Sequence, residues 1–206
     1  MTKVKLCGMT RPEDIEICNA LLPDYVGFVF WPESRRYISL QRAESLSRSL
    51  DRRITPVGVF LDEPLETVLR VAESGTIGMI QLHGSESQEY IKTVKEETGL
   101  PVIRALKVTS EKDIAAPGMC DYIMFDSGAG TGRTFDWSLL GEAGKRCFLA
   151  GGLNPDNVAG AIREVHPYAV DTSSGIETDG VKDPVKMKKF MEAVRMADSD
   201  IGEERI

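Results

Sequence analysis

Cys7 and Asp126 stand at the ends of two apolar segments, one beginning near Lys3 and the other near Asp121. A carboxylate at the end of a buried strand has few roles except to cap the next loop or to take part in chemistry. A cysteine in an apolar strand is more often a small buried side chain, although a thiol with a lowered pKa is reactive. Asp126 is therefore a candidate functional residue by position alone, and Cys7 is a candidate that needs support from other features.

Four further polar residues stand at or near strand ends: Arg36, Gln81, His83 and Asp171. Side-chain alternation points Gln81, His83 and Asp171 to the inner face. His83 alone is more typical of a structural histidine, because the two His of the chain are too few for a zinc site. Asp171 can instead accept hydrogen bonds from the loop that follows it. Arg36 can hold a carboxylate in bidentate fashion or belong to a solvated charge cluster.

Two glycine-rich segments follow the last two apolar segments. They are Ala150–Asn154 and Thr172–Glu177. Glycine lets backbone N–H groups approach an anion closely, and a helix N-terminus adds a favourable dipole. Phosphate sites in barrels are frequently built from the loops after the seventh and eighth strands. The two segments together predict a phosphate site, and the alternative is a pair of ordinary helix entries.

A third glycine-rich segment, Ser127–Trp137, directly follows Asp126. It lacks the Gly-Lys-Ser/Thr ending of a nucleotide-binding P-loop. A lid or substrate loop fits its length and composition better.

The elements that must position these residues recur about 20 to 30 residues apart. Apolar segments begin near Lys3, Tyr25, Pro56, Thr76, Pro101, Asp121, Arg146 and Tyr168. This spacing is too long for hairpins and fits one strand plus one helix in each unit. It predicts an α/β fold, either an open doubly wound sheet or a closed (β/α)8 TIM barrel. We favour the barrel, with short helices, because closure removes both sheet edges.

Helix boundaries are also predicted from the sequence. Capping boxes are expected at Thr10–Glu13 and at Ser85–Gln88. We expect a single domain over residues 1–206, with a frayed polar tail at 198–206.

Composition excludes several classes of protein. The net charge of −7 disfavours nucleic acid and anionic membranes as partners. No apolar run approaches the ~18 residues of a membrane helix, and the chain begins without a targeting signal, so we expect a cytoplasmic protein. Its four Cys are widely spread, which argues against disulfides and zinc clusters. Cys18, Cys120 and Cys147 are expected to pack in the core.

Six short motifs, taken together, give the chain a resemblance to a known enzyme family. They are Lys5–Thr10, Ser34–Ser39, Gln81–Gly84, Gly130–Trp137, Gly151–Pro155 and Asp171–Glu177. In this order they resemble the phosphoribosylanthranilate isomerase family of tryptophan biosynthesis, over roughly residues 3 to 195. Leu6 stands where the family pattern leads us to expect Ile, and Thr172 where Val is common. Neither departure falls on a residue to which the resemblance gives a role in the chemistry.

The resemblance implies an Amadori rearrangement of N-(5-phosphoribosyl)anthranilate to 1-(2-carboxyphenylamino)-1-deoxyribulose 5-phosphate, with no metal or organic cofactor. It makes Asp126 the general acid that opens the sugar ring and Cys7 the general base that removes a proton from the second sugar carbon. An acid working near neutral pH needs a raised pKa, and a thiol base needs a lowered one. Lys5 is a candidate cause of a lowered pKa at Cys7.

The resemblance also assigns the residues that bind substrate. Arg36 is expected to contact the anthranilate carboxylate, Gln81 and His83 to line that end, and Asp171 to bind sugar hydroxyls. The implied phosphate ligands are Gly151, Gly152, Ser173, Ser174 and Gly175. The expected partner is a small phosphosugar, and the chain is expected to be a monomer or a homodimer.

Three alternatives remain open at this point. One is another phosphosugar barrel of the epimerase type, which would lean on paired Asp residues and His-bound metal. Another is a thiol hydrolase with Cys7 as nucleophile and His83 as base. The third is a non-catalytic phosphate-binding barrel, which would have no need for both Cys7 and Asp126.

Overall fold

Eight strands form a closed barrel in which each strand neighbours the next one along the chain. They are β1 (Lys3–Cys7), β2 (Tyr25–Val29), β3 (Thr55–Phe60), β4 (Met79–Leu82), β5 (Val102–Lys107), β6 (Tyr122–Asp126), β7 (Cys147–Leu149) and β8 (Ala169–Thr172). The predicted TIM barrel is confirmed, and the open sheet is excluded. These segments form strands because they are short and rich in β-branched and aromatic residues, which suit a parallel sheet buried on both faces.

Helices follow most of the strands. They are α1 (Pro12–Leu21), α2 (Leu40–Arg48), α3 (Leu65–Glu73), α4 (Gln88–Thr98), α5 (Val158–Val165) and α6 (Pro184–Glu203). Two 3-10 segments, η2 (Trp137–Arg146) and η3 (Ser174–Ile176), and a hairpin of β9 (Glu177–Thr178) and β10 (Val181–Lys182) complete the elements. Among the described residues, no helix has both the length and the apolar character needed to cross a bilayer.

The computed structural model describes residues 1–203 except 109, 111–113, 115–117 and 128–135. Most of the expected lid, Ser127–Trp137, therefore lies outside the described residues.

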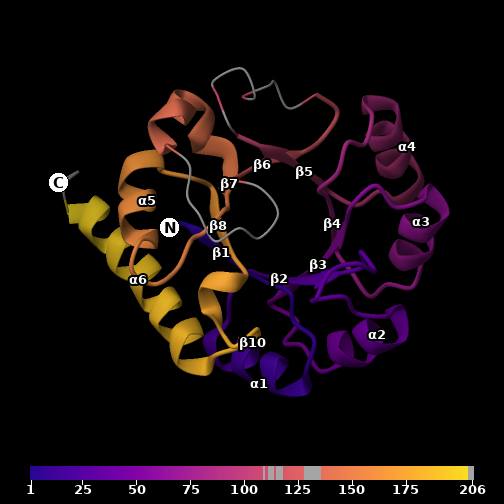
Figure 1. Ribbon diagram of the computed structural model, residues 1–206, viewed down its shortest axis with the longest axis horizontal. Coiled ribbons are helices and arrows are strands. Elements are labelled where there is room, and N and C mark those ends of the chain that lie inside the picture. Colours follow the sequence, from indigo (N-terminus) through magenta and orange to yellow (C-terminus); the bar gives the residue numbers. More distant parts are fainter. Residues whose placement is uncertain (109, 111–113, 115–117, 128–135, 204–206) are drawn as a thin grey trace. The chain divides into compact units, whose positions relative to one another are not determined.

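The chain divides into two compact units. The first unit contains Met1–Leu6, Leu106–Ala115 and Met124–Ile206, and the second contains Cys7–Ala105 and Ala116–Ile123. The expectation of one domain over residues 1–206 stays a prediction. In the second unit, α2, α3 and α4 lie outside β2, β3 and β4 (Figure 1). In the first unit, α5 and α6 pack side by side, and β1 pairs with β8 (Figure 1).

Two helices begin differently from the predicted capping boxes. At α1 the carboxylate of Asp14 accepts hydrogen bonds from the N–H groups of Thr10 and Arg11, both at 3.0 Å, so the box uses Asp14 in place of Glu13. At α4 the Ser87 hydroxyl accepts from the Tyr90 N–H at 3.1 Å. Ser85 lies two positions ahead of this cap, and its N–H and hydroxyl both donate to Asp62, at 2.7 and 3.0 Å.

The end of the chain also differs from the expected frayed tail. Helix α6 continues through Asp198 to Glu203, and residues 204–206 lie outside the described part. The Asp198 carboxylate accepts hydrogen bonds from the N–H of Thr2 at 2.8 and 3.0 Å and from its hydroxyl at 2.7 Å. These bonds tie the last helix to the start of β1.

Candidate active site

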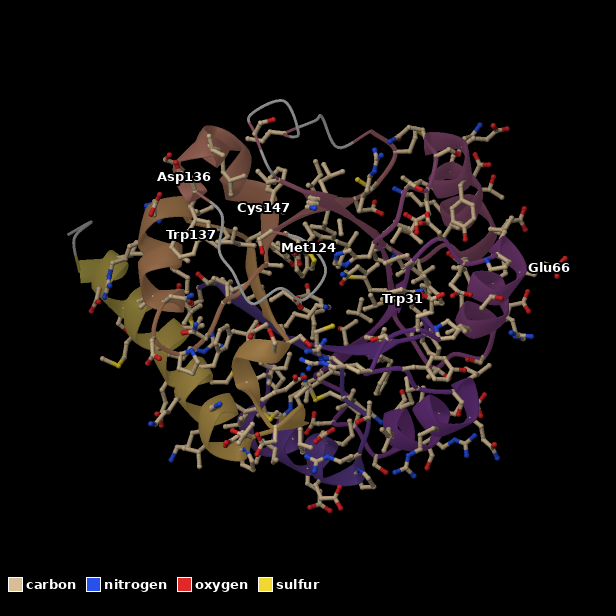
Figure 2. All side chains as sticks on the ribbon, in the orientation of Figure 1. Trp31, Glu66, Met124, Asp136, Trp137 and Cys147 are labelled. Atoms are coloured by element: carbon tan, nitrogen blue, oxygen red, sulfur yellow. The ribbon has the colours of Figure 1, made fainter. Side chains whose placement is uncertain are left out.

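Cys7 ends β1 in a tight apolar setting in the second unit. Its side chain is part of a buried cluster with Val29 and Val59, against which Trp31 packs, and Cys7 is 7% exposed. Figure 2 shows Trp31 on the inner side of the strands, whereas Glu66 on α3 projects outward. The thiol therefore borders an apolar wall formed by three neighbouring residues.

Gly27 on β2 provides the space that the thiol occupies. A Cβ at position 27 would lie 2.5 Å from Cys7 Sγ and 3.1 Å from its Cα. The Gly27 carbonyl accepts hydrogen bonds from the N–H groups of Gly8 at 2.9 Å and Met9 at 3.0 Å. Gly8 takes a left-handed φ of 83°, which lets the chain turn away just after Cys7.

Gln81 and His83 form a hydrogen-bonded pair at the end of β4. Gln81 Nε2 lies 2.9 Å from His83 Nδ1, and Gln81 is buried. This contact joins the two side chains, and the tautomer of the His83 ring decides which of them donates the hydrogen bond. Val59 of the Cys7 cluster is the register partner of Gln81, which places the pair on the strand beside that cluster.

Glu86 is a positioning residue of the second unit that the sequence did not single out. Its buried carboxylate accepts hydrogen bonds from the N–H of Asp62 at 3.0 Å and of Gly84 at 2.9 Å. It thereby joins the loop after β3 to the loop after His83. An acidic residue two positions beyond a Gly at a strand end is the only sequence signal that could have found it.

Arg36 lies in a loop that returns to the end of β2. Its N–H donates to the Ser34 hydroxyl at 3.1 Å. The next residue, Tyr37, forms an isolated parallel bridge with Val29, and the Ile38 N–H donates to the Val29 carbonyl at 2.9 Å. The second unit thus gathers Cys7, Gln81, His83 and the Arg36 loop around the ends of neighbouring strands.

Asp126 ends β6 in the first unit and is 9% exposed. Its carbonyl accepts a hydrogen bond from the Val108 N–H at 2.9 Å. The next residue, Ser127, lies directly against Gly151, where a Cβ would come within 2.5 Å of the Ser127 nitrogen and Oγ. The chain that leaves Asp126 therefore packs onto the first of the two predicted phosphate loops.

The first predicted phosphate loop is shaped by two consecutive left-handed glycines. Gly151 and Gly152 have φ values of 87° and 68°, which favour glycine over residues with a Cβ. The side-chain amide of Asn157 donates to the Gly152 carbonyl at 3.0 Å. The loop is therefore held at the N-terminus of α5. Backbone N–H groups at a helix N-terminus have no partner within the helix and point outward.

The second predicted phosphate loop is joined to the first one. The buried Thr172 hydroxyl donates to the Leu153 carbonyl at 2.7 Å. Gly175 approaches the same carbonyl so closely that a Cβ would collide with it. Thr172 is not among the predicted site residues, yet it ties the two loops together. The first unit thus brings Asp126, Gly151, Gly152 and the segment 173–175 into one connected arrangement.

Asp171 forms a buried ion pair with Lys5. Lys5 Nζ lies 2.6 Å from Asp171 Oδ1, and Lys5 is 0% exposed. The two residues are register partners on β1 and β8. Lys5 is thus engaged by a carboxylate and is not an isolated positive charge on the strand of Cys7. Opposite charges on the inner faces of the first and eighth strands are the signal that could have predicted this pair.

The remaining cysteines are buried in the core, as expected. Cys18 Sγ lies 3.7 Å from the Met9 sulfur. Burial raises the pKa of the Cys147 thiol to about 12 and also raises the pKa of Cys120. These two thiols stay protonated near neutral pH and serve packing.

Comparison with known proteins agrees with the geometry. The chain matches the family described as N-(5'phosphoribosyl)anthranilate (PRA) isomerase over residues 4–193. It is 45% identical over 204 residues to the N-(5'-phosphoribosyl)anthranilate isomerase of Thermoanaerobacter sp. strain X514, covering 95% of this chain and 98% of that protein. The enzyme of the same name from Clostridium acetobutylicum is 44% identical over 206 residues, covering 95% and 98%.

Solved structures show the same relationship. The phosphoribosyl anthranilate isomerase of Thermotoga maritima superposes with a TM-score of 0.86 at 38% identity, covering 95% of this chain and 99% of that one. A phosphoribosyl anthranilate isomerase in complex with reduced 1-(o-carboxyphenylamino)-1-deoxyribulose 5-phosphate gives a TM-score of 0.85 at 38% identity, with the same coverage. With a family match over residues 4–193 and nearly full-length similarity to these enzymes, the chain belongs to the N-(5'-phosphoribosyl)anthranilate isomerase family.

Proposed function

We propose that this chain catalyses the Amadori rearrangement of N-(5-phosphoribosyl)anthranilate in tryptophan biosynthesis, with Asp126 as general acid and Cys7 as general base. The observation that carries the proposal is that each of these residues is the last residue of a barrel strand. TIM-barrel enzymes carry their catalytic residues at the carboxyl ends of the strands. Membership of the isomerase family favours this reaction over a hydrolase, an epimerase or a non-catalytic barrel.

In the first step, Asp126 gives its proton to the ring oxygen of the furanose, and the bond between that oxygen and the anomeric carbon breaks. The lone pair of the anthranilate nitrogen forms a second bond to the anomeric carbon, which gives an iminium. In the second step, the Cys7 thiolate removes the proton on the second sugar carbon, and the electron pair of that bond neutralises the iminium to give an enolamine. The enolamine tautomerises to the ketone, and both residues regain their starting protonation states by exchange with water.

The surroundings bear differently on the two residues. Val29, Val59 and Trp31 form an apolar wall at the Cys7 thiol, which keeps water away from the atom that must take the proton, while apolar surroundings by themselves favour a neutral thiol over a thiolate. Asp126 adjoins the Gly151 loop through Ser127, so a sugar whose phosphate sits on that loop lies near its carboxyl. Proximity of this kind supports proton transfer within one bound substrate.

The same proposal assigns the substrate contacts. The backbone N–H groups of Gly151, Gly152, Ser174 and Gly175, with the Ser173 hydroxyl, bind the phosphate. Asp171 accepts hydrogen bonds from sugar hydroxyls, and Arg36 pairs with the anthranilate carboxylate. Gln81 and His83 line the anthranilate end. The partner is thus a small phosphosugar, and the proposed location is the cytoplasm.

The test is a fluorescence assay that follows the consumption of phosphoribosylanthranilate. Cys7→Ala and Asp126→Asn are each expected to lower kcat by about 10²–10⁴-fold with little change in KM, because each removes one proton-transfer group. Cys120→Ala and Asp179→Asn are the matched controls, since Cys120 is a buried thiol of the second unit and Asp179 is exposed in the β9–β10 turn. Full turnover by either of the first two variants overturns the role of that residue.

A further inference from the structure

A buried lysine lies behind the second phosphate loop. Lys182, on β10, is 4% exposed, and its Nζ donates to the Ser173 carbonyl at 2.9 Å and the Ser173 hydroxyl at 3.3 Å. The same nitrogen lies 2.6 Å from Glu177 Oε1 on β9. The family resemblance and the proposed function leave Lys182 without a role.

The contacts of Lys182 account for its burial. An ammonium has three donors, and these three oxygens supply three acceptors. Burial of an isolated charge is very costly, whereas a paired and hydrogen-bonded charge is tolerated. The nearby carboxylate of Glu177 also offsets most of the long-range field of the ammonium. Its effect on a ligand is therefore exerted through the geometry of Ser173 more than through distant attraction.

The hydrogen bond to the Ser173 hydroxyl has a direction. An ammonium can only donate, so the hydroxyl oxygen is the acceptor in this contact and its own proton points elsewhere. The Ser173 carbonyl is held by the same nitrogen, which fixes the peptide plane leading into Ser174. A hydroxyl proton turned away from the lysine and a fixed backbone plane are the features that an anion-binding loop needs.

The hairpin that carries Lys182 is itself anchored. The Asp183 N–H donates to the Ile176 carbonyl at 2.9 Å, and the Thr178 hydroxyl donates to Asp183 Oδ2 at 2.7 Å. Lys186 Nζ donates to the Glu177 carbonyl at 2.7 Å. The β9–β10 hairpin is thereby fastened to the first turn of α6, so the lysine works from a rigid support.

We propose that Lys182 is a positioning residue for the phosphate site, holding the Ser173 hydroxyl and the peptide plane that leads into Ser174 in the orientation that receives the phosphate. This inference rests on the proposed function, because it takes the segment 173–175 as a phosphate loop. It adds a residue that acts through Ser173 without touching the substrate.

The experiment compares Lys182→Met with the double variant Glu177→Gln/Lys182→Met. The double variant removes both buried charges, so it avoids the unpaired carboxylate that can prevent the single variant from folding. Lys188→Met is the matched control, because Lys188 is exposed on α6 and its Nζ lies 3.8 Å from Glu192. Each protein is measured for kcat, for KM with phosphoribosylanthranilate, for thermal unfolding and for binding of inorganic phosphate by calorimetry.

We expect the double variant to weaken phosphate binding and raise KM by about tenfold each, while kcat changes by less than about threefold. Lys188→Met should leave all these quantities unchanged. A folded double variant with a lower melting temperature but wild-type phosphate affinity would show that Lys182 only stabilises the fold, and would overturn the proposal.

The calorimetric measurement separates this inference from the proposed function. If the wild-type chain binds phosphate but does not consume phosphoribosylanthranilate, the proposed reaction is wrong, and the phosphate affinities of the variants still decide the role of Lys182. If the wild-type chain binds no phosphate, both the phosphate loop and the role of Lys182 are overturned.

Discussion

Gly27 controls the position of the Cys7 sulfur although it carries no functional group. The absence of a Cβ is what leaves room for Sγ, because a Cβ at this position would lie only 2.5 Å from the sulfur. The conformation of Gly27 does not itself require glycine, since its φ is not left-handed. The requirement for glycine at this position therefore comes from the neighbouring thiol.

We predict that Gly27→Ala lowers kcat by about 10- to 100-fold while the protein stays folded. The new methyl group forces the sulfur to move, and a displacement of about 1 Å at a reacting atom can cost about 10²-fold in rate. Steady-state kinetics and circular dichroism check the two halves of this prediction. Gly78→Ala is the control, because its Cβ would meet only Thr55 Cγ2, at 3.2 Å, within 4 Å.

At the scale of single residues, the sequence predicts which side chains are candidates for function better than it predicts which residues they contact. Cys7 and Asp126 stand out because they end strands and carry recognisable chemistry, and the glycines of the predicted phosphate loops stand out because they follow strands. The partnership of Lys5 with Asp171 depends on which strands become neighbours when the barrel closes, and that information is absent from local spacing. The same holds for Lys182 and Ser173, whose contact depends on the fold of a short hairpin.

At the scale of elements, the two predicted phosphate loops are joined into one structure. Thr172 at the end of β8 reaches the carbonyl of Leu153, which follows the Gly151–Gly152 turn. The contact is buried, so the carbonyl would lose its hydrogen bond without gaining water if the hydroxyl were removed. The relative position of the loops is therefore sensitive to one side chain.

We predict that Thr172→Val destabilises the protein by about 1–3 kcal/mol, the cost of leaving a buried carbonyl unsatisfied. It should also raise KM several-fold, with a smaller effect on kcat, because the loops that receive the phosphate lose a connection. Urea unfolding and steady-state kinetics give the two quantities. Thr93→Val serves as the control, since the Thr93 hydroxyl bonds to the Glu89 carbonyl on the exposed surface of α4. Equal stability and KM in both variants would contradict the prediction.

The eight barrel strands and their alternation with helices followed from the sequence, but the β9–β10 hairpin, the 3-10 segments and the details of helix starts did not. Periodic apolar segments indicate a strand or helix regardless of tertiary context. Capping depends on competition between nearby polar groups. Ser85 and Ser87 both have the right residue type for a cap. The Ser87 hydroxyl accepts the Tyr90 N–H and caps α4, whereas Ser85 donates to Asp62 of the preceding loop.

At the scale of the whole molecule, the beginning of the chain is fastened to its last helix. Asp198 on α6 receives three hydrogen-bond contacts from Thr2 just ahead of β1, and Arg195 donates to the Thr2 carbonyl at 3.1 Å. The sequence indicated a polar tail here because charged residues dominate it. The tertiary contact overrides that local preference.

We expect Asp198→Ala to destabilise the protein by about 1.5–3 kcal/mol, the range for hydrogen bonds to a charged group. Asp200→Ala, on the same helix, should have an effect below about 1 kcal/mol, because Asp200 pairs with Arg163 on the exposed surface. Thermal and urea unfolding of the two variants measure the contrast. Equal losses would show that Thr2 and Asp198 contribute nothing beyond a surface contact.

Because of Cys147, the stability of the protein decreases as the pH becomes alkaline. Burial raises its pKa from 9.0 to about 12, so the folded state holds a proton that the unfolded chain releases. The resulting stability is fully present below pH 9 and is lost as the pH rises toward 12. Between pH 8 and pH 11.5, wild-type protein should lose about 3 kcal/mol more than Cys147→Val. Urea unfolding at both pH values checks this, and parallel losses in the two proteins would contradict it.

The close approach of Gly175 to the Leu153 carbonyl has a consequence for engineering and for divergence of related barrels. The Leu153 loop is joined to the 172–175 segment by the Thr172 hydrogen bond and by the close approach of Gly175. A designer who transplants only one of these two contacts into another scaffold would not reproduce the relative position of the loops. The successful graft must move both connections together, with Thr172 and the supporting hairpin. Natural variants that replace Thr172 or Gly175 are accordingly expected to carry compensating changes in the loop that contains Leu153.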